Sequence, residues 1–421
     1  MDLDREWFAG ELIRRFVRYA RIHTTSDRHG EETPSTPGQW DLAKLLVAEL
    51  REIGVEDIYF DDHAYIIARI PATIPDGELP TIGIMAHMDT APDLTGQGVS
   101  PQVRDEYDGG DIALSEEYTL SPTDYPDLLR YIGETIITTD GTTLLGADDK
   151  AGVAEIMTVV SYLQDHPEIG HGPIEIIFTP DEETGRGMDK FPTRELSSAV
   201  CYTLDGDREG TIEAECFNAY KVTVHFTGYV IHPGQARGKL ANATAMAGSF
   251  LSMIPRSESP EATDGRYGFY CPTEVKGTLA ESTVELIVRD FEIDEVNRRI
   301  AFLEAAADAV AKAFPGGSAR VETTKQYLNM RDALREIPEA LEHLTQAVRD
   351  TGVEPELKLI RGGTDGSRLT EMGVPTPNIF AGGMNFHGRY EWVAVPAMIR
   401  AAKTVINLVQ RWASGGSVLP R

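Results

Sequence analysis

Short apolar runs with the character of buried strands alternate along this chain with patterns of helical spacing. The runs are rich in β-branched residues, and between them apolar residues recur at intervals of three and four. This alternation is typical of an α/β domain, so we expect a mixed central sheet flanked by helices. The strand-like runs are Thr81–Met85, Ile174–Phe178, Ala199–Leu204 and Pro377–Phe380, and the helical patterns occupy residues 5–22, 39–53, 152–163, 337–351 and 397–412.

The segment between about residues 213 and 327 shows a different order of predicted strands and helices. Strand, helix, strand, strand, helix and strand follow one another there, which is the order of a ferredoxin-like βαββαβ unit. Because elements of the α/β type resume afterwards, we predict a larger domain in two parts, 1–212 and 328–421, with the smaller domain, 213–327, inserted between them. The six inserted elements are expected at residues 220–226, 243–253, 273–279, 284–291, 295–314 and 319–327.

The composition limits the partners of the protein. The 421 residues include 67 acidic and 39 basic side chains, which give a formal net charge of −28. This charge repels nucleic acid and anionic membrane surfaces, so we expect neither as a partner. No stretch approaches the roughly 20 apolar residues of a membrane span, and the amino terminus lacks the pattern of a secretory signal. We therefore expect a cytoplasmic protein.

The cysteines exclude one kind of metal site. Cys201, Cys216 and Cys271 are odd in number and show no paired spacing. Such an arrangement indicates neither a disulfide framework nor a thiolate zinc site.

Three adjacent carboxylates follow the apolar run at 174–178. Asp181, Glu182 and Glu183 come directly after Pro180. Like charges so close together repel unless a cation neutralises them or a proton is shared, which favours a metal site with an acid/base beside it. Charge runs also mark solvated faces, so an acidic turn is the alternative for this segment alone.

Each of the four strand-like runs leads to a residue that can bind a metal. Ligands of open α/β sheets bind at the carboxyl ends of the strands, so residues far apart in sequence can converge there. His87 follows the first run, Glu183 the second, Asp205 the third and His387 the fourth. We expect these four side chains to meet at one edge of the sheet.

Two aspartates, Asp148 and Asp149, lie just before the helical pattern at 152–163. Aspartate is favoured at a helix amino terminus, where it accepts backbone hydrogen bonds and interacts well with the helix dipole. An ordinary cap is therefore one explanation. A cap needs only one aspartate, however, and this loop offers two, so Asp148 is a fifth candidate ligand.

Asp89 is expected to orient His87. Residues i and i+2 of a strand lie on one side, so the Asp89 carboxylate can accept the proton of the imidazole nitrogen that does not bind metal. A turn cap is the alternative for Asp89. Six further histidines occupy polar contexts without companion ligands and are expected to be solvated: His23, His29, His63, His166, His171 and His343.

Imidazole and carboxylate ligands with an open position suit catalytic zinc, which lowers the pKa of bound water towards about 7. Two zinc ions carry four positive charges, and the three candidate carboxylates leave a charge that one hydroxide would cancel. Glu182, adjacent to a ligand but not needed as one, is then the natural general base. The predicted ligands are His87, Asp148, Glu183, Asp205 and His387.

At these residues the chain resembles the peptidase T family of tripeptide aminopeptidases, within the superfamily of co-catalytic zinc peptidases and aminoacylases. The Leu-Leu-Gly-Ala-Asp-Asp-Lys and Asn-Phe-His-Gly segments point to that family in particular. The matching motifs extend over nearly the whole chain and comprise His87–Asp93, Thr143–Gly152, Pro180–Glu183, Phe217–Ala219, His232–Gly234 and Asn385–Gly388.

The resemblance implies roles for these residues. Asp148 is expected to bridge two zinc ions, with His87 and Asp205 completing one position and Glu183 and His387 the other. Related enzymes have a cis peptide after the bridging aspartate. Cobalt or manganese are expected substitutes for zinc.

The resemblance also implies that the insert is a lid that closes over the substrate. His232 then helps to polarise the scissile carbonyl, Arg289 holds a substrate carboxylate, and Asn242 is a weaker candidate for substrate binding. A turn residue is the alternative for His232, and a surface ion pair is the alternative for Arg289. Dimerisation through the insert is common among relatives, which leaves a homodimer open.

We therefore predict a zinc-dependent hydrolase that releases the N-terminal residue of tripeptides, with small peptides as its partners. A related dipeptidase, carboxypeptidase or N-acyl amino acid deacylase is the nearest alternative, because the metal residues are common to all of them. A non-catalytic metal-binding protein is a more distant alternative, since structural metal sites are usually closed and thiolate-rich.

Overall fold

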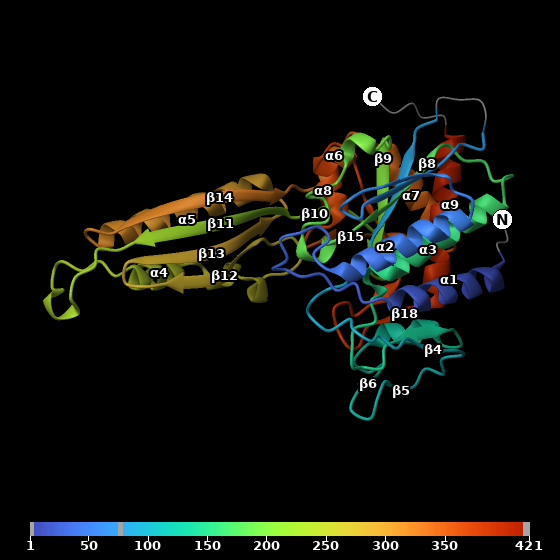
Figure 1. Ribbon diagram of the computed structural model, residues 1–421. Coiled ribbons are helices and arrows are strands. Elements are labelled where there is room, and N and C mark those ends of the chain that lie inside the picture. The colour runs from blue at the N-terminus through green and yellow to red at the C-terminus, as the bar shows by residue number, and fades with distance from the viewer. Residues whose placement is uncertain (1–3, 75–78, 416–421) are drawn as a thin grey trace. The chain divides into compact units, whose positions relative to one another are not determined.

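The computed structural model describes residues 4–74 and 79–415, which form two compact units (Figure 1). The first unit comprises the chain up to Ala214, Asp332–Lys358 and the chain from Thr364 onwards; the second comprises Glu215–Arg331 and Leu359–Gly363. The boundaries expected at 213 and 327 lie within four residues of 215 and 331. The segment Leu359–Gly363 also belongs to the second unit, although the sequence placed all residues after 327 in the larger domain.

An eight-stranded mixed sheet forms the centre of the first unit, in the order β1-β2-β8-β3-β9-β16-β10-β15. The middle strands β8, β3, β9 and β16 are parallel, whereas β1 runs antiparallel to β2, β2 to β8, and β10 to β16. The mixed central sheet predicted from the sequence is confirmed. The strands are β1 (Asp57–Phe60), β2 (Ile66–Ile70), β3 (Ile82–His87), β8 (Ile174–Thr179), β9 (Val200–Gly206), β10 (Thr211–Cys216), β15 (Glu356–Ile360) and β16 (Asn378–Phe380).

Helices cover both faces of this sheet. On one face α1, α3 and α9 contact one another, and α3 packs against β3 and β9 (Figure 1). On the other face α8 contributes Leu369 to a cluster with Met85 of β3 and Ile177 of β8. All residues of β3 and β8 are therefore buried, as in sheets covered on both sides. The helices are α1 (Arg5–Ala20), α2 (Pro37–Glu52), α3 (Ala147–Asp165), α6 (Arg331–Arg335), α7 (Pro338–Arg349), α8 (Asp365–Glu371) and α9 (Val395–Ser414).

A second, four-stranded antiparallel sheet belongs to the first unit, with the order β17-β18-β7-β4, and a short hairpin, β5-β6, accompanies it. A core of aromatic and aliphatic side chains that includes Tyr131, Ile136 and Trp392 holds this region together. The sheet matters for the site because the segments that carry Asp148 and His387 adjoin it. Its strands are β4 (Gln102–Arg104), β7 (Ile136–Thr138), β17 (Gly383–Met384) and β18 (Trp392–Ala394), and the hairpin is β5 (Ile112–Ala113) and β6 (Thr119–Leu120).

The second unit contains a four-stranded antiparallel sheet with the order β12-β13-β11-β14. Alternate residues of β11 and β13, such as Val222, Val224 and Leu286, face a core that they share with α4 and α5. The period of two in these strands thus buries one face of the sheet under the helices. The order along the chain is β-α-β-β-α-β, with β11 (Asn218–Thr227), α4 (Ala243–Met253), β12 (Phe269–Gly277), β13 (Glu281–Asp290), α5 (Ile293–Ala313) and β14 (Ser318–Tyr327).

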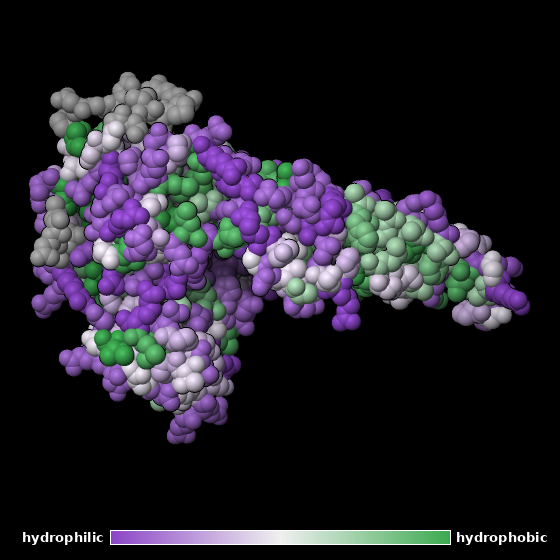
Figure 2. All heavy atoms as spheres, turned by 180° about the vertical axis from the view of Figure 1, so that it is seen from behind, coloured by the Kyte–Doolittle hydropathy of each residue, from purple (hydrophilic) through white to green (hydrophobic). Residues whose placement is uncertain are grey.

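The molecular surface agrees with the composition. The face in Figure 2 is mainly hydrophilic, in keeping with the 25% charged residues of the sequence. Among the described residues, no helix is long and apolar enough to cross a membrane.

Of the six histidines expected to be solvated, His171 is buried, and His63, His166 and His343 are half-buried. His171 is buried, with Nδ1 2.7 Å from the Gly172 carbonyl oxygen, and burial lowers the pKa of its imidazole. His343 is half-buried against the ring of Trp412. The polar neighbours of these residues in sequence do not reveal that the fold packs other segments over them.

Candidate metal centre

The carboxyl ends of three parallel strands meet at one edge of the large sheet. His87, the last residue of β3, is the partner of Thr179, the last residue of β8. Asp205 is the penultimate residue of β9, which pairs with β3 on its other side. Glu182 and Glu183 begin a short 3-10 turn directly after β8. The strand register therefore brings His87, Asp205, Glu182 and Glu183 to the same edge of the sheet.

Asp148 lies between two imidazole rings. Its Oδ1 is 2.9 Å from His87 Nε2, and its Oδ2 is 3.2 Å from His387 Nε2. Each oxygen of one carboxylate thus faces a different histidine. The carboxylate of Asp148 thus connects the two histidines.

Two further carboxylates complete the pattern. Asp205 Oδ1 lies 3.5 Å from His87 Nε2, and Glu183 Oε2 lies 3.1 Å from His387 Nε2. On each side of Asp148 there is consequently one imidazole nitrogen and one other carboxylate. Ligand atoms of His87, Asp148 and Glu183 all lie within 4.8 Å of one another.

The neighbouring Asp149 has a different environment. Its Oδ2 accepts a hydrogen bond from the His87 backbone N–H at 3.1 Å, and its Oδ1 accepts one from the Gly152 N–H at 3.2 Å. Ligand atoms of Asp149, His87 and Asp205 lie within 4.8 Å of one another, which is close enough to share a metal ion. Both carboxylate oxygens of Asp149, however, accept hydrogen bonds from backbone N–H groups. Asp149 therefore caps the part of α3 that follows the kink at residues 148 and 149, and Asp148 remains available for a metal. The peptide bond between the two aspartates is cis.

Asp89 contacts more of the site than the sequence predicts. His87 Nδ1 lies 3.1 Å from the Asp89 carbonyl oxygen and 3.4 Å from its Oδ1. The same carboxylate accepts the backbone N–H groups of Glu182 at 2.9 Å and Glu183 at 3.1 Å. One buried carboxylate thus connects the end of β3 to the acidic turn after β8.

Asp181, for which the sequence suggests no role, fixes the other side of that turn. It is fully buried and adopts a left-handed backbone conformation with φ of 57°. Its carboxylate accepts hydrogen bonds from the Ser35 N–H and hydroxyl and from Gln39 Nε2. The segment that begins α2 is thereby joined to the end of β8, next to Glu182.

The acidic residues of the site perturb one another. Burial raises the pKa of Glu182 well above its ordinary value, and the nearby charges of Asp205 and Asp365 add to this effect. Burial likewise raises the pKa of Glu183 to about 8. Hydrogen bonds to Asp148 and Glu183 raise the pKa of His387 to about 11. Without a cation these shifts favour the protonated forms of Glu182, Glu183 and His387, whereas a bound cation would favour ionised carboxylates and a neutral imidazole.

The donor atoms fit a metal ion. Glu183 Oε1 is buried and has no hydrogen-bond partner among the described residues, although a buried carboxylate oxygen normally has one. The set of imidazole nitrogens and carboxylate oxygens is one that zinc and related divalent metals accept. These residues form a candidate metal site.

Two more buried acids adjoin the site and were not singled out from the sequence. Asp365, at the start of α8, accepts a hydrogen bond from the Thr179 hydroxyl at 2.6 Å, and burial raises its pKa to about 7. Glu391 accepts hydrogen bonds from the loop that carries Asp148. The available signal in the sequence was the glycine directly after Asp365 and, for Glu391, the apolar run that follows it.

The three residues expected to bind substrate lie in the second unit. His232 is exposed, and its Nδ1 accepts the Gly234 N–H at 3.2 Å. Asn242 caps α4, because its side-chain oxygen accepts the backbone N–H groups of residues 244 and 245. Their roles toward a substrate stay predictions.

Arg289 is almost fully buried within the second unit, with 8% of its surface exposed. Its guanidinium donates hydrogen bonds to the carbonyl oxygens of Tyr220 and Val288 and to Gln326 Oε1. It is therefore not the surface ion pair that the sequence left open. Its role toward a substrate also stays a prediction.

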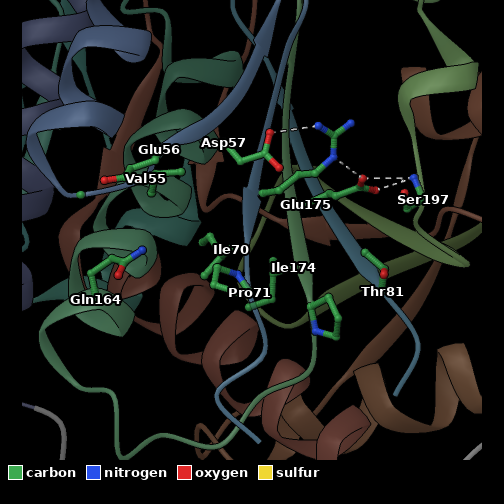
Figure 3. Close-up of a pocket in the computed structure, with 13 residues that line it drawn as sticks. Val55, Glu56, Asp57, Ile70, Pro71, Thr81, Gln164, Ile174, Glu175 and Ser197 are labelled. Carbon is green, nitrogen blue, oxygen red and sulfur yellow. Dashed lines mark hydrogen bonds and ion pairs between the residues drawn. The ribbon is translucent and has the colours of Figure 1, made fainter. Parts of the chain in front are cut away.

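A separate cavity of about 470 Å³ lies at the opposite end of the same strands (Figure 3). Thr81 and Ile174, at the amino ends of β3 and β8, line it, whereas His87 lies at the far end of β3, about 17 Å away for a strand of this length. Asp57 and Glu175, which Figure 3 labels, both form ion pairs with Arg69. Because it lies at the other end of these strands from His87, this cavity is not the metal centre.

The fold and the site belong to a known class. The chain is a member of Peptidase family M20/M25/M40, whose model matches residues 139–411.

Among its relatives, Peptidase T of Geobacillus thermodenitrificans is 46% identical over 402 residues, which cover 95% of this chain and 98% of that protein. The fold is similar to that of the aminopeptidase PepT from Bacillus cereus, with a TM-score of 0.74 and 23% identity over 96% of this chain and 99% of that one. It is also similar to a tripeptidase from Staphylococcus aureus, with a TM-score of 0.76 and 20% identity over 96% and 98% of the two chains.

Proposed function

We propose that this protein is a metal-dependent aminopeptidase that releases the N-terminal residue of tripeptides. The observation that carries the proposal is the position of Asp148 between His87 and His387, with Glu182 close by and not engaged in either group of ligands. The 46% identity to a Peptidase T over nearly the whole chain supports the substrate class.

We further propose that the metal centre holds two zinc ions. His87 and Asp205 would hold one, Glu183 and His387 the other, and Asp148 would contact both. When bound, zinc supplies Lewis-acid activation of water and of the scissile carbonyl. The unpartnered Oε1 of Glu183 and the divided contacts of Asp148 support this assignment. Cobalt or manganese are proposed as substitutes.

In the proposed reaction Glu182 acts first as the general base and then as the general acid. Its carboxylate accepts a proton from the attacking water while the water oxygen forms a bond to the first peptide carbonyl carbon. Glu182 then donates this proton to the leaving amine nitrogen as the carbon–nitrogen bond breaks. The products are a free amino acid and a dipeptide. Asp89 keeps Glu182 in place through the backbone hydrogen bond at 2.9 Å.

His232, Arg289 and Asn242 are proposed to bind the substrate, on the resemblance given above. His232 would polarise the carbonyl, and Arg289 would hold the C-terminal carboxylate. For His232 the exposed imidazole supports this assignment. For Arg289 the existing hydrogen bonds mean that a substrate carboxylate would have to share its guanidinium.

A panel of di-, tri- and tetrapeptides, assayed beside N-acyl amino acids, tests the proposal. We expect tripeptides with a free amino terminus to be cleaved fastest. Faster turnover of dipeptides or of N-acyl amino acids would instead identify the related dipeptidases or deacylases. Tight metal binding without hydrolysis of any panel member would indicate a non-catalytic metal-binding protein.

Two further expectations complete the proposal. A cytoplasmic location is supported by the three free cysteines, Cys201, Cys216 and Cys271, and fractionation of cells tests it. A homodimer is the oligomeric state that the resemblance allows, and light scattering of the purified protein decides between monomer and dimer.

A further inference from the structure

Glu391 is a buried acid that lies between two segments of the metal centre. It directly precedes β18, is 1% exposed, and follows His387 by four residues. It is not among the groups of residues whose atoms could hold a metal. Its burial therefore calls for an explanation other than coordination.

The side-chain hydrogen bonds of Glu391 are with the loop that ends in Asp148. Its Oε2 accepts the backbone N–H groups of Leu145 at 2.7 Å and Gly146 at 2.9 Å, and its Oε1 accepts the Asp148 N–H at 3.1 Å. The first N–H groups of a helix have no partner within the helix. Gly146, at the cap position of α3, has no side chain to supply one and has φ of 81°. The Glu391 carboxylate accepts one of these first helical N–H groups, that of Asp148, together with two N–H groups of the loop just before α3.

A backbone hydrogen bond also holds Glu391 to the turn that carries His387. Its own backbone N–H donates to the Gly388 carbonyl oxygen at 3.2 Å. The side chain of Asn385 closes the same turn by donating to the Tyr390 carbonyl oxygen at 2.9 Å. A single residue thus connects the two loops that deliver Asp148 and His387.

We propose that Glu391 is a positioning residue that holds Asp148 in register with His387, and that it thereby sets the affinity of the site for metal. This inference rests on the proposed function, because it assumes that Asp148 and His387 share a metal ion. The relevant distance is the 3.2 Å between Asp148 Oδ2 and His387 Nε2. Loss of the hydrogen bonds to the Glu391 carboxylate lets the loop before α3 move, and Asp148 moves with it. Metal ligands tolerate little displacement from their positions. Removal of residues that support metal ligands typically weakens metal binding about 10–100-fold.

Glu175 provides a matched control. It is also 1% exposed, and it too accepts several hydrogen bonds from the start of a neighbouring segment, from the N–H groups of Ser197 and Ser198 and from the Ser198 hydroxyl. It lies in β8 at the opposite end of the sheet, beside the cavity in Figure 3. Its replacement removes a comparable buried carboxylate without touching the metal centre.

The experiment compares Glu391→Gln and Glu175→Gln in the full-length protein. A glutamine keeps the shape but offers an NH2 group in place of one acceptor oxygen. Zinc affinity is measured by competition with a chromogenic chelator, the ligand geometry by the visible absorption of the cobalt-loaded protein, and stability by thermal unfolding in excess chelator. We expect Glu391→Gln to weaken zinc binding 10–100-fold and to change the cobalt spectrum. We expect Glu175→Gln to lower the unfolding temperature and to leave zinc affinity within about twofold of wild type.

Glu391→Asp keeps the charge and shortens the side chain by one methylene, so zinc affinity between those of the wild type and Glu391→Gln supports the inference. If Glu391→Gln does not fold, Glu391→Asp carries the test alone, with a weakened zinc affinity as the supporting result. Wild-type zinc affinity and cobalt spectrum in a folded Glu391 variant overturn the inference, as does an equal loss of zinc affinity in Glu175→Gln. Failure of the wild-type protein to bind zinc would instead reject the proposed function.

Discussion

The Asp89 carboxylate accepts a hydrogen bond from the backbone N–H of Glu182, with 2.9 Å between Oδ1 and the nitrogen. Its second oxygen accepts the next N–H, that of Glu183, at 3.1 Å. The proposed base and a proposed metal ligand are therefore held by the same acid that contacts His87 Nδ1. A change at Asp89 must affect the position of the base as well as the orientation of the histidine.

Replacement of Asp89 by asparagine should lower kcat about 10–100-fold. The amide keeps the size of the side chain but turns one acceptor into a donor that faces the N–H groups of Glu182 and Glu183. Steady-state kinetics together with metal analysis provide the test. A variant that is fully loaded with metal and has wild-type kcat would contradict this role.

Replacement of Glu182 by glutamine should leave metal binding intact and lower kcat about 10²–10⁴-fold, because the amide cannot accept the proton of the attacking water. KM should change far less than kcat. The measurement is tripeptide hydrolysis by protein of known metal content. Turnover at the wild-type rate by the metal-loaded variant would remove Glu182 from the mechanism.

Removal of metal by a chelator should abolish activity, and zinc or cobalt should restore it. The folded protein should also lose stability, since a metal that binds only the folded state at 100 times its Kd contributes about 2.7 kcal/mol. Activity and the unfolding temperature are to be measured before and after chelation and after metal is returned. Full activity of protein shown to be metal-free would rule out the proposed chemistry.

Substitutions at His232 and Arg289 should separate substrate binding from stability. His232 is exposed, so His232→Ala should lower kcat/KM for tripeptides without changing the unfolding temperature. Arg289→Ala should also cost about 1–3 kcal/mol of stability, because it removes the buried hydrogen bonds that the guanidinium donates to the Tyr220 and Val288 carbonyl oxygens. Kinetics and urea unfolding of both variants are the measurements. Wild-type kcat/KM in His232→Ala would refute its assignment.

The buried His171 should make the stability of the metal-free protein depend on pH. Burial lowers the pKa of this imidazole below its usual value of 6.5, so the unfolded chain binds a proton more readily than the folded protein. Stability should therefore be fully present above pH 6.5 and fall as the pH drops towards the folded pKa, by at most about 1.4 kcal/mol per pH unit.

Replacement of His171 by asparagine removes the titrating group and leaves an N–H donor for the Gly172 carbonyl oxygen. Urea unfolding in chelator at pH 7.5 and pH 5.5 should then show a smaller loss of stability on acidification than in the wild type. Equal losses in the two proteins would show that His171 does not cause the dependence.

Local patterns in the sequence were sufficient to predict the mixed central sheet and its buried parallel strands. The apolar runs that precede His87, Glu183 and Asp205 correspond to β3, β8 and β9, because burial on both faces leaves few polar residues in a strand. Short strands were not predicted, among them β1 and the strands of the second sheet. These strands have too few residues for a period of two to be recognised, and pairing with distant segments stabilises them.

The sequence by itself determined which residues could serve a metal centre, since His87, Asp148, Glu183, Asp205 and His387 are readable as side chains at strand ends and at one helix start. Only the tertiary structure decided how Asp148 and Asp149 differ, because neighbours in sequence acquire different partners when distant segments pack around them. The same holds for Asp181 and Glu391, whose hydrogen-bond partners lie more than 140 residues away. Chemical type is a local property of the chain, whereas the partner of a buried charge depends on the whole fold.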